Sequence, residues 1–250
     1  MKLMFLGTGA ADYDWSKYGQ EGIAGSTVTL LEENILLDCG PTAKAAMDRY
    51  GVKAEAINCI VNTHSHGDHL DVENVRSIAA GRKIDFYGTV QACGKVADIC
   101  NVHAITYGDE FTVNGCTFLT LPSNHAVEDI REETFNYLIS CNGKTLLYAL
   151  DTAWMLAKAR RLIGDKHIDA IVWDATMLQP DNWRIFEHSD PVMFAAMRRV
   201  LKKSGNITDD VKVWFDHRAL TLWPTDPAEQ EAIARRENVM LAHEGESVII

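Results

Sequence analysis

The sequence predicts an α/β fold in which two β-sheets pack together and helices cover their outer faces, a four-layer αββα sandwich. Strand-like apolar runs come in groups punctuated by helical segments, once in each half of the chain, and two helix-covered sheets account for that pattern. The chain has 250 residues, of which 47% are hydrophobic and 24% are charged, as in ordinary globular domains. Because no solenoid repeat, low-complexity tract or linker interrupts it, we expect a single domain over residues 1–250.

Strands are expected where short runs of apolar, β-branched or aromatic residues stand between turn signals. Asn142-Gly143 lies between two such runs and is a strong hairpin signal, and Asn114-Gly115 is a second one. The predicted strands are Lys2–Gly7, Ser26–Glu32, Asn34–Asp38, Ile57–Asn62, Ile84–Tyr87, Glu110–Leu121, Phe135–Cys141, Lys144–Leu150, Ala170–Trp173, Lys212–Phe215, Val239–Ala242 and Ser247–Ile250. We expect the last two strands to form a pair.

Helices are expected where apolar residues recur every three or four positions, as they do across Asp71–Ala80. Three of the predicted helices have a proline near their start, where the missing N–H of proline costs little. The predicted helices are Pro41–Tyr50, Val72–Gly81, Thr89–Cys100, Trp154–Gly164, Pro191–Lys203 and Pro227–Glu237.

Two long stretches, Ala10–Gly25 and Gln179–Ser189, match neither pattern and are expected to be irregular. Long loops in compact domains are often functional. Their aromatic residues Trp15, Tyr18 and Trp183 either line the mouth of a substrate site or pack the loops onto the body of the protein, as aromatic side chains commonly do.

The formal net charge of −11 argues against a broad surface for polyanions, since affinity for nucleic acids draws on many lysine and arginine contacts to phosphates. Bound metal ions would offset part of this charge locally, so a small anionic substrate remains acceptable. No apolar run approaches the roughly 20 residues that a membrane span requires. The sequence leaves the oligomeric state open, a homo-oligomer included.

The six cysteines are dispersed and form no C-x-x-C pair. Most have apolar neighbours in the sequence, which predicts buried reduced thiols of the kind found in cytosolic proteins. The first residues are too short an apolar run for a signal peptide. We therefore expect a cytoplasmic protein.

One short stretch brings together His64, His66, Asp68 and His69, directly after a predicted strand and before a predicted helix. Such a stretch buries little apolar surface and gathers imidazoles that repel each other when protonated, so folding alone does not explain it. Neutral imidazole and carboxylate are common ligands of zinc, iron and manganese. The loop at the carboxyl end of a strand is also where open α/β sheets bind ligands. The cluster therefore predicts a metal site.

The order of residues H-x-H-x-D-H after a strand resembles the signature of the metallo-β-lactamase fold hydrolases. Further stretches occur in the family's order: Leu6-Gly-Thr-Gly9, Leu36-Leu-Asp-Cys-Gly40, Leu121-Pro-Ser-Asn-His125, Leu150-Asp151, Glu187-His-Ser189 and Trp214-Phe-Asp-His217. The ending, residues 239–248, is similar to the closing strands of the family's phosphodiesterase branch, which includes the phosphoribosyl cyclic phosphodiesterases and the tRNA 3′-endonucleases. The resemblance implies the αββα fold and spans nearly the whole chain.

The resemblance also implies two divalent metal ions, zinc or manganese, with iron possible. One ion would be held by His64, His66 and His125, and the other by Asp68, His69 and His217, with Asp151 bridging them. Without the resemblance, Asp151 could instead cap the following helix, and either later histidine could be an ordinary loop residue. The first long loop has no cysteine, so we expect no third metal there.

Three more residues are candidates around the metals. His188 would face the phosphate and assist the leaving oxygen, as a similar His-Ser histidine does in the phosphodiesterase branch; the alternative is a histidine in a capping loop. Asp38 and Asp216 could hold ligand imidazoles by their second N–H, although Asp38 could equally be a turn residue before a glycine.

A metal-dependent phosphodiesterase acting on small cyclic or linear phosphodiesters is the function these residues favour. Two metal ions would activate a bridging hydroxide for in-line attack, with Asp68 orienting or receiving its proton and His188 acting at the phosphate. A thioester or lactone hydrolase is the first alternative, because the same nucleophile attacks carbonyls. An RNA 3′-processing endonuclease is the second, disfavoured by the acidic charge, and a non-catalytic metal-binding scaffold is the third.

Overall fold

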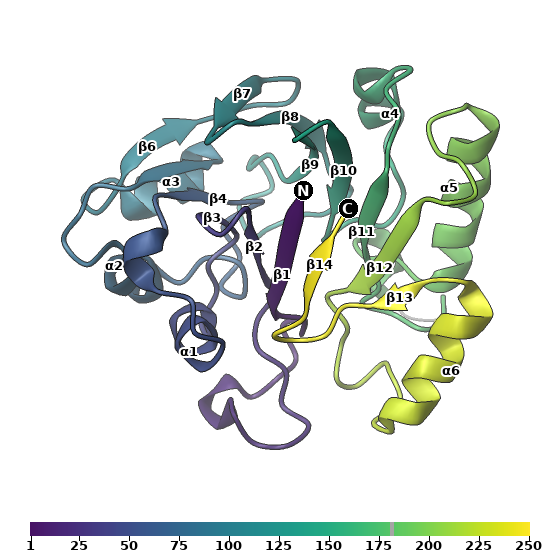
Figure 1. The fold of residues 1–250 in the computed structure, drawn as a ribbon, viewed down its shortest axis with the longest axis horizontal. Helices are drawn as coiled ribbons and strands as arrows, with labels where there is room; N and C mark the ends of the chain where they lie inside the picture. Colours follow the sequence, from purple (N-terminus) through teal and green to yellow (C-terminus); the bar gives the residue numbers. More distant parts are fainter. Residues whose placement is uncertain (181–182) are drawn as a thin grey trace. The chain divides into compact units, whose positions relative to one another are not determined.

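The computed structural model describes residues 1–180 and 183–250, which form two compact units. The first unit contains Met1–Thr106, Val127–Glu133 and His243–Ile249, and the second contains Tyr107–Ala126, Thr134–Ala242 and Ile250. Each unit has one seven-stranded mixed sheet with helices against it (Figure 1). Two mixed sheets flanked by helices confirm the predicted fold class.

The sheet of the first unit has the strand order β14-β1-β2-β3-β4-β5-β6. Its neighbours are antiparallel from β14 to β3 and parallel from β3 to β6. The strands are β1 (Lys2–Gly7), β2 (Val28–Leu31), β3 (Ile35–Leu37), β4 (Cys59–Val61), β5 (Asp85–Gly88), β6 (Asn101–Ala104) and β14 (Ser247–Ile249). Every residue of β2, β3 and β4 is buried, which explains the apolar runs of β3 and β4 and the largely apolar β2.

Three helices, α1 (Ala43–Arg49), α2 (Val72–Ala79) and α3 (Val90–Val96), cover one face of this sheet (Figure 1). Their apolar residues form one core with alternate apolar residues of the strands, such as Leu30, Leu36 and Ile60. Asp71 caps the start of α2, because its side chain accepts a hydrogen bond from the Asn74 backbone N–H. Thr89 caps α3 in the same way by accepting from the Ala92 backbone N–H. The metal-motif residues lie between β4 and α2, as the sequence predicts.

The sheet of the second unit has the order β13-β12-β11-β10-β9-β8-β7, antiparallel from β7 to β10 and parallel from β10 to β13. The strands are β7 (Glu110–Val113), β8 (Cys116–Pro122), β9 (Phe135–Cys141), β10 (Lys144–Ala149), β11 (Ala170–Asp174), β12 (Lys212–Asp216) and β13 (Met240–Leu241). Helices α4 (Ala157–Ile163), α5 (Pro191–Lys203) and α6 (Pro227–Glu237) pack on one face of it (Figure 1).

Most predicted elements occur in the structure, and β1, β9, α5 and α6 have the predicted bounds. The sequence prediction missed β6, whose four residues are all exposed and therefore have no apolar run. The predicted pairing of the last two strands is wrong. β13 pairs with β12 in the second unit, whereas β14 pairs with β1 in the first. Two short apolar runs do not reveal which sheet each of them joins.

The cysteine prediction needs one correction. Cys116 and Cys141 form a disulfide, with their Cα atoms 4.4 Å apart. They stand opposite each other on β8 and β9, one step beyond the Thr117–Ser140 pair, a position from which a bridge can close. The other four cysteines are buried free thiols, as expected. In the described part of the chain, no helix has the length and apolar character needed to cross a membrane.

Candidate metal centre

The first unit places its candidate ligands at the carboxyl ends of β3 and β4. The backbone N–H of Cys39 donates to the carbonyl of His69 at 2.9 Å, so the end of β3 lies directly against the metal-binding loop. Gly40 is required at this close approach, because a Cβ there would meet the Asp68 carbonyl oxygen at 1.9 Å. The motif is therefore held by the neighbouring strand end.

Asp38 accepts several hydrogen bonds from the metal motif and the residues just before it, all in the first unit. Its fully buried carboxylate accepts from the backbone N–H of Thr63 at 2.7 Å, from the side-chain amide of Asn62 at 2.9 Å and from Nδ1–H of His69 at 2.7 Å. Its backbone has a φ of 64°, a strained conformation for a residue with a side chain. Asp38 thus orients the His69 imidazole and leaves its Nε2 turned away from the bond.

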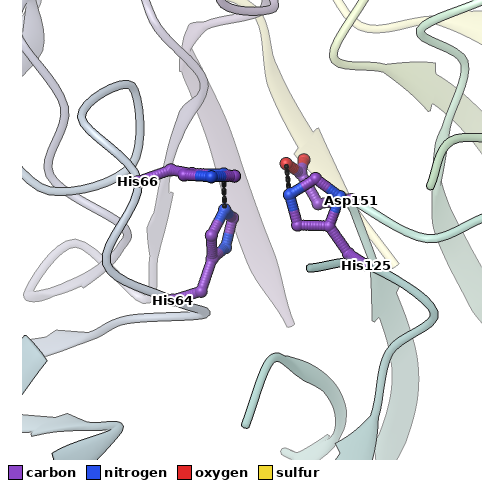
Figure 2. A group of neighbouring side chains, drawn as sticks. All are labelled: His64, His66, His125 and Asp151. Carbon is purple, nitrogen blue, oxygen red and sulfur yellow. Dashed lines mark hydrogen bonds and ion pairs between the residues drawn. The ribbon is translucent and has the colours of Figure 1, made fainter. Parts of the chain in front are cut away.

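His64 and His66 form a converging pair, drawn in Figure 2. The Thr63 hydroxyl donates to Asp38 and accepts from Nδ1 of His64 at 2.9 Å, which leaves Nε2 of His64 with a lone pair. That Nε2 lies 3.0 Å from Nδ1 of His66. Two imidazole nitrogens that point at the same place suit one metal ion.

His69 and Asp68 form a second ligand pair in the same unit. Nε2 of His69 lies 3.4 Å from a carboxylate oxygen of Asp68, and both side chains are buried. Buried imidazoles and carboxylates without a cation are costly to keep in one loop. The first unit therefore offers two sets of donors, one of nitrogen only and one of nitrogen and oxygen.

We expect Asp38→Ala to lower the free energy of unfolding of the metal-free protein by at least about 3 kcal/mol. Several buried donors would lose their acceptor, and each unsatisfied group costs about 1–3 kcal/mol. Urea unfolding measures this. Asp85→Ala is the control, because Asp85 pairs with His103 at an exposed position and should contribute less than about 1 kcal/mol. Equal losses for the two variants would contradict the role of Asp38.

The second unit places its candidate residues at the ends of three strands: His125 follows β8, Asp151 follows β10 and His217 follows β12. All three side chains are almost fully buried. Asp151 and His217 have φ values of 47° and 57°, a conformation that non-glycine residues adopt at a cost and often at functional sites. Asp151 does not cap a helix, since α4 begins only at Ala157.

The carboxylate of Asp151 faces two different imidazoles with its two oxygens. Oδ2 lies 3.5 Å from Nε2 of His125, a pair drawn in Figure 2, and Oδ1 lies 3.2 Å from Nε2 of His217. Nδ1–H of His125 points to the carbonyl of Glu187 at 3.4 Å, so its Nε2 is the nitrogen that carries a lone pair. A carboxylate shared in this way is suited to bridge two cations.

His188 lies in the same unit and is held by Asp174, a residue that the sequence prediction missed. Nδ1–H of His188 donates to Oδ2 of the fully buried Asp174 at 2.8 Å. Burial lowers the pKa of His188, but the Asp174 carboxylate raises it more, so this pKa lies above its ordinary value. Ligand atoms of Asp151, Asp174, His188 and His217 all lie within 4.8 Å of one another.

The sequence does contain a signal for Asp174, which is the last residue of the buried strand β11. Asp38 and Asp151 likewise lie just beyond the ends of β3 and β10. The Asp174 carboxylate is also fixed by backbone hydrogen bonds, which it accepts from the N–H groups of Thr152, Thr176 and Ser189. Asp174 is therefore a positioning residue for His188.

For His217 the structure differs from the expected Asp216 contact. The Thr176 hydroxyl lies 2.8 Å from Nδ1 of His217. Asp216 instead accepts a hydrogen bond from the backbone N–H of His217, also at 2.8 Å. The turn at the end of β12 brings Asp216 to the main chain of its neighbour. Thr176 also lies 3.1 Å from Nδ1 of His188, so one hydroxyl contacts both histidines.

Of the aromatic loop residues, Tyr18 packs against its own unit and Trp183 is exposed. Tyr18 is half buried and hydrogen-bonds to the carboxylate of Glu244, which also accepts the Gly25 backbone N–H, so Tyr18 packs its loop onto the first unit. Trp183 remains 64% exposed in a short 3-10 helix just before His188, with the Arg184 guanidinium over its ring. Residues 181 and 182 of the second irregular stretch lie outside the described residues.

Comparison with known proteins agrees with this geometry. A family model described as "Beta-lactamase superfamily domain" matches residues 33–207, more than half of the chain. The chain belongs to the beta-lactamase superfamily. The match contains the His64–His69 motif, His125, Asp151 and His188. Among curated proteins, none matches the chain.

Solved structures share the fold of this chain at low sequence identity. A diphosphatase of the PhnP family is 18% identical, with a TM-score of 0.73 over 99% of this chain and 96% of its own. Human tRNase Z, short form, is 20% identical, with a TM-score of 0.69 over 100% and 99%. Zinc-bound PqqB from Methylobacterium extorquens is 16% identical, with a TM-score of 0.70 over 100% of both chains.

These likenesses confirm the metallo-β-lactamase fold that the sequence predicts. The family match and the His and Asp clusters, which suit divalent metal ions, make the chain a metal-dependent hydrolase of the beta-lactamase superfamily.

Proposed function

We propose that this chain is a binuclear phosphodiesterase acting on small cyclic or linear phosphodiesters. The observation that carries the proposal is that each unit contains its own group of buried candidate metal ligands. The first unit presents the His64–His66 pair and the Asp68–His69 pair, and the second presents two histidines that share one carboxylate, Asp151.

In this proposal His64, His66 and His125 would hold one ion, and Asp68, His69 and His217 would hold the other, with Asp151 available to both. Such a ligand set would leave room for water and substrate, as catalytic sites require. The mixture of nitrogen and oxygen donors accepts zinc or manganese, and also iron.

Two divalent ions, when bound, lower the pKa of a shared water and neutralise negative charge on the substrate oxygens. Asp68 is buried and adjacent to a ligand, so its carboxylate orients the attacking water or receives its proton. His188 uses Nδ1–H to hold Asp174, so Nε2 is the atom that donates to a phosphoryl oxygen or to the departing oxygen.

The acidic charge favours a small diester over an RNA substrate. The similar structures include a diphosphatase and a tRNase, so the fold occurs in enzymes named for phosphate-containing substrates of different size. Here the interval between His125 and Asp151 consists of the segment Val127–Glu133 and the short hairpin of β9 and β10, with Asn142-Gly143 at its turn, and it is too short for a long RNA-binding arm. Thioester or lactone hydrolysis is the second candidate, since the same activated water attacks carbonyls.

The metal-loaded protein should hydrolyse small diesters such as bis(p-nitrophenyl) phosphate or a cyclic ribose phosphate, and should process tRNA precursors poorly. A substrate panel that includes lactones and thioesters, assayed with zinc, manganese and iron, tests this. Efficient tRNA cleavage that weakens steeply with salt would contradict the proposal, because that dependence marks contacts between phosphates and a basic surface. Activity on lactones or thioesters alone would favour the second candidate.

A further inference from the structure

Glu132 is a buried acidic residue that the proposed reaction does not use. It lies in the segment Val127–Glu133, which connects β8 to β9 but belongs to the first unit. Only 8% of Glu132 is exposed. A buried carboxylate is costly unless hydrogen bonds compensate it, so its partners indicate why it is there.

Two of these partners are groups of Ser65, the residue between His64 and His66. The Ser65 backbone N–H donates to Oε1 of Glu132 at 2.9 Å, and the Ser65 hydroxyl donates to Oε2 at 2.7 Å. The carbonyl of the same residue accepts from the Lys95 ammonium at 2.8 Å. Both the backbone N–H and the carbonyl of Ser65 therefore form hydrogen bonds with residues outside the metal motif.

The third partner connects this contact to helix α3. The hydroxyl of Thr89, the N-cap of α3, donates to Oε1 of Glu132 at 2.7 Å while accepting the Ala92 backbone N–H at 2.9 Å. Ser65, Thr89 and Glu132 are all buried. The side chain of Glu132 is thus fixed by groups that are themselves fixed by secondary structure.

We propose that Glu132 is a positioning residue for the first metal ion. Its bidentate contact with Ser65 sets the backbone between the two histidines, where Nε2 of His64 and Nδ1 of His66 lie 3.0 Å apart. A ligand pair that is already oriented loses less conformational freedom on binding, and outer hydrogen-bond partners typically contribute 10–100-fold to metal affinity. This inference rests on the proposed metal site but not on the substrate.

The test is the affinity of the protein for Zn²⁺, measured by competition with a chromophoric chelator. Glu132→Gln keeps the shape of the side chain but cannot accept both Ser65 bonds as a carboxylate does, and we expect a 10–100-fold weaker first site. Excess zinc should restore kcat, because the ligands themselves are intact. Glu133→Gln is the matched control; its carboxylate accepts from Thr106, and it should bind zinc as tightly as the unmodified chain.

Thr89→Val separates positioning from stability. It removes the cap of α3 but leaves both Ser65 bonds in place, so it should lower Tm while zinc affinity stays within a few-fold. If Glu132→Gln does not fold, Ser65→Ala, which removes only the hydroxyl donor, should weaken zinc binding about 2–10-fold, the effect of one hydrogen bond.

If Glu132→Gln folds and binds zinc as tightly as the unmodified chain, the inference is overturned. If Glu132→Gln does not fold, unchanged zinc affinity in Ser65→Ala overturns it. Either result leaves the proposed function intact. Failure of the unmodified chain to bind zinc, manganese or iron would overturn both.

Discussion

His188→Ala should lower kcat for an unactivated diester by about 10²–10⁴-fold while both metal ions and the fold are retained. That range is typical of a general acid–base group, and His188 is held by Asp174 rather than placed as one of the proposed ligands. If donation to the leaving oxygen is its main role, the loss should shrink for p-nitrophenolate, which needs little protonation. Rates on both substrates and elemental analysis measure the effect.

His103→Ala is the matched control for this experiment. His103 also pairs with an aspartate, Asp85, at 2.9 Å, but the pair is exposed on β5 and β6 and lies outside the candidate site. Its removal should leave both rates unchanged. Unchanged rates for His188→Ala as well would show that His188 is an ordinary loop residue, and the phosphodiesterase proposal would lose its main support beyond the metal ligands.

His217→Ala should reduce the metal content of fully loaded protein from two ions per chain to one and lower activity by at least about 10²-fold. Loss of an outer partner already costs 10–100-fold, and this variant removes a ligand itself. His167→Ala, an exposed histidine of the same unit, should keep both ions. A content of two ions in His217→Ala, or of one ion in the unmodified chain, would contradict the proposed ligand set.

The sequence alone determines most local elements of this protein. Hydrophobic periodicity and turn residues are local properties, so β9, α5 and α6 are predicted with their observed bounds. The H-x-H-x-D-H motif is local too, and its position after β4 places it at the carboxyl end of an inner strand of the first sheet. Asp151 and His217 are predicted as candidate ligands from family order, and the structure places both just after strand ends, as the sequence indicates.

Only the tertiary structure decides which distant residues meet. The Asp174–His188 contact joins residues 14 positions apart, the Glu132–Ser65 contact 67, and the Cys116–Cys141 bridge 25. The same holds for β13 and β14, which are close in the sequence and join different sheets.

The physical reason is that a hydrogen bond or a strand pairing depends on where the chain returns in space, and a single sequence carries no local signal of that return. An aspartate at a strand end has the same local pattern whether it holds an imidazole, as Asp38 does, or a backbone N–H, as Asp216 does. The sequence therefore predicts the candidate ligands, and the fold determines which residues orient them.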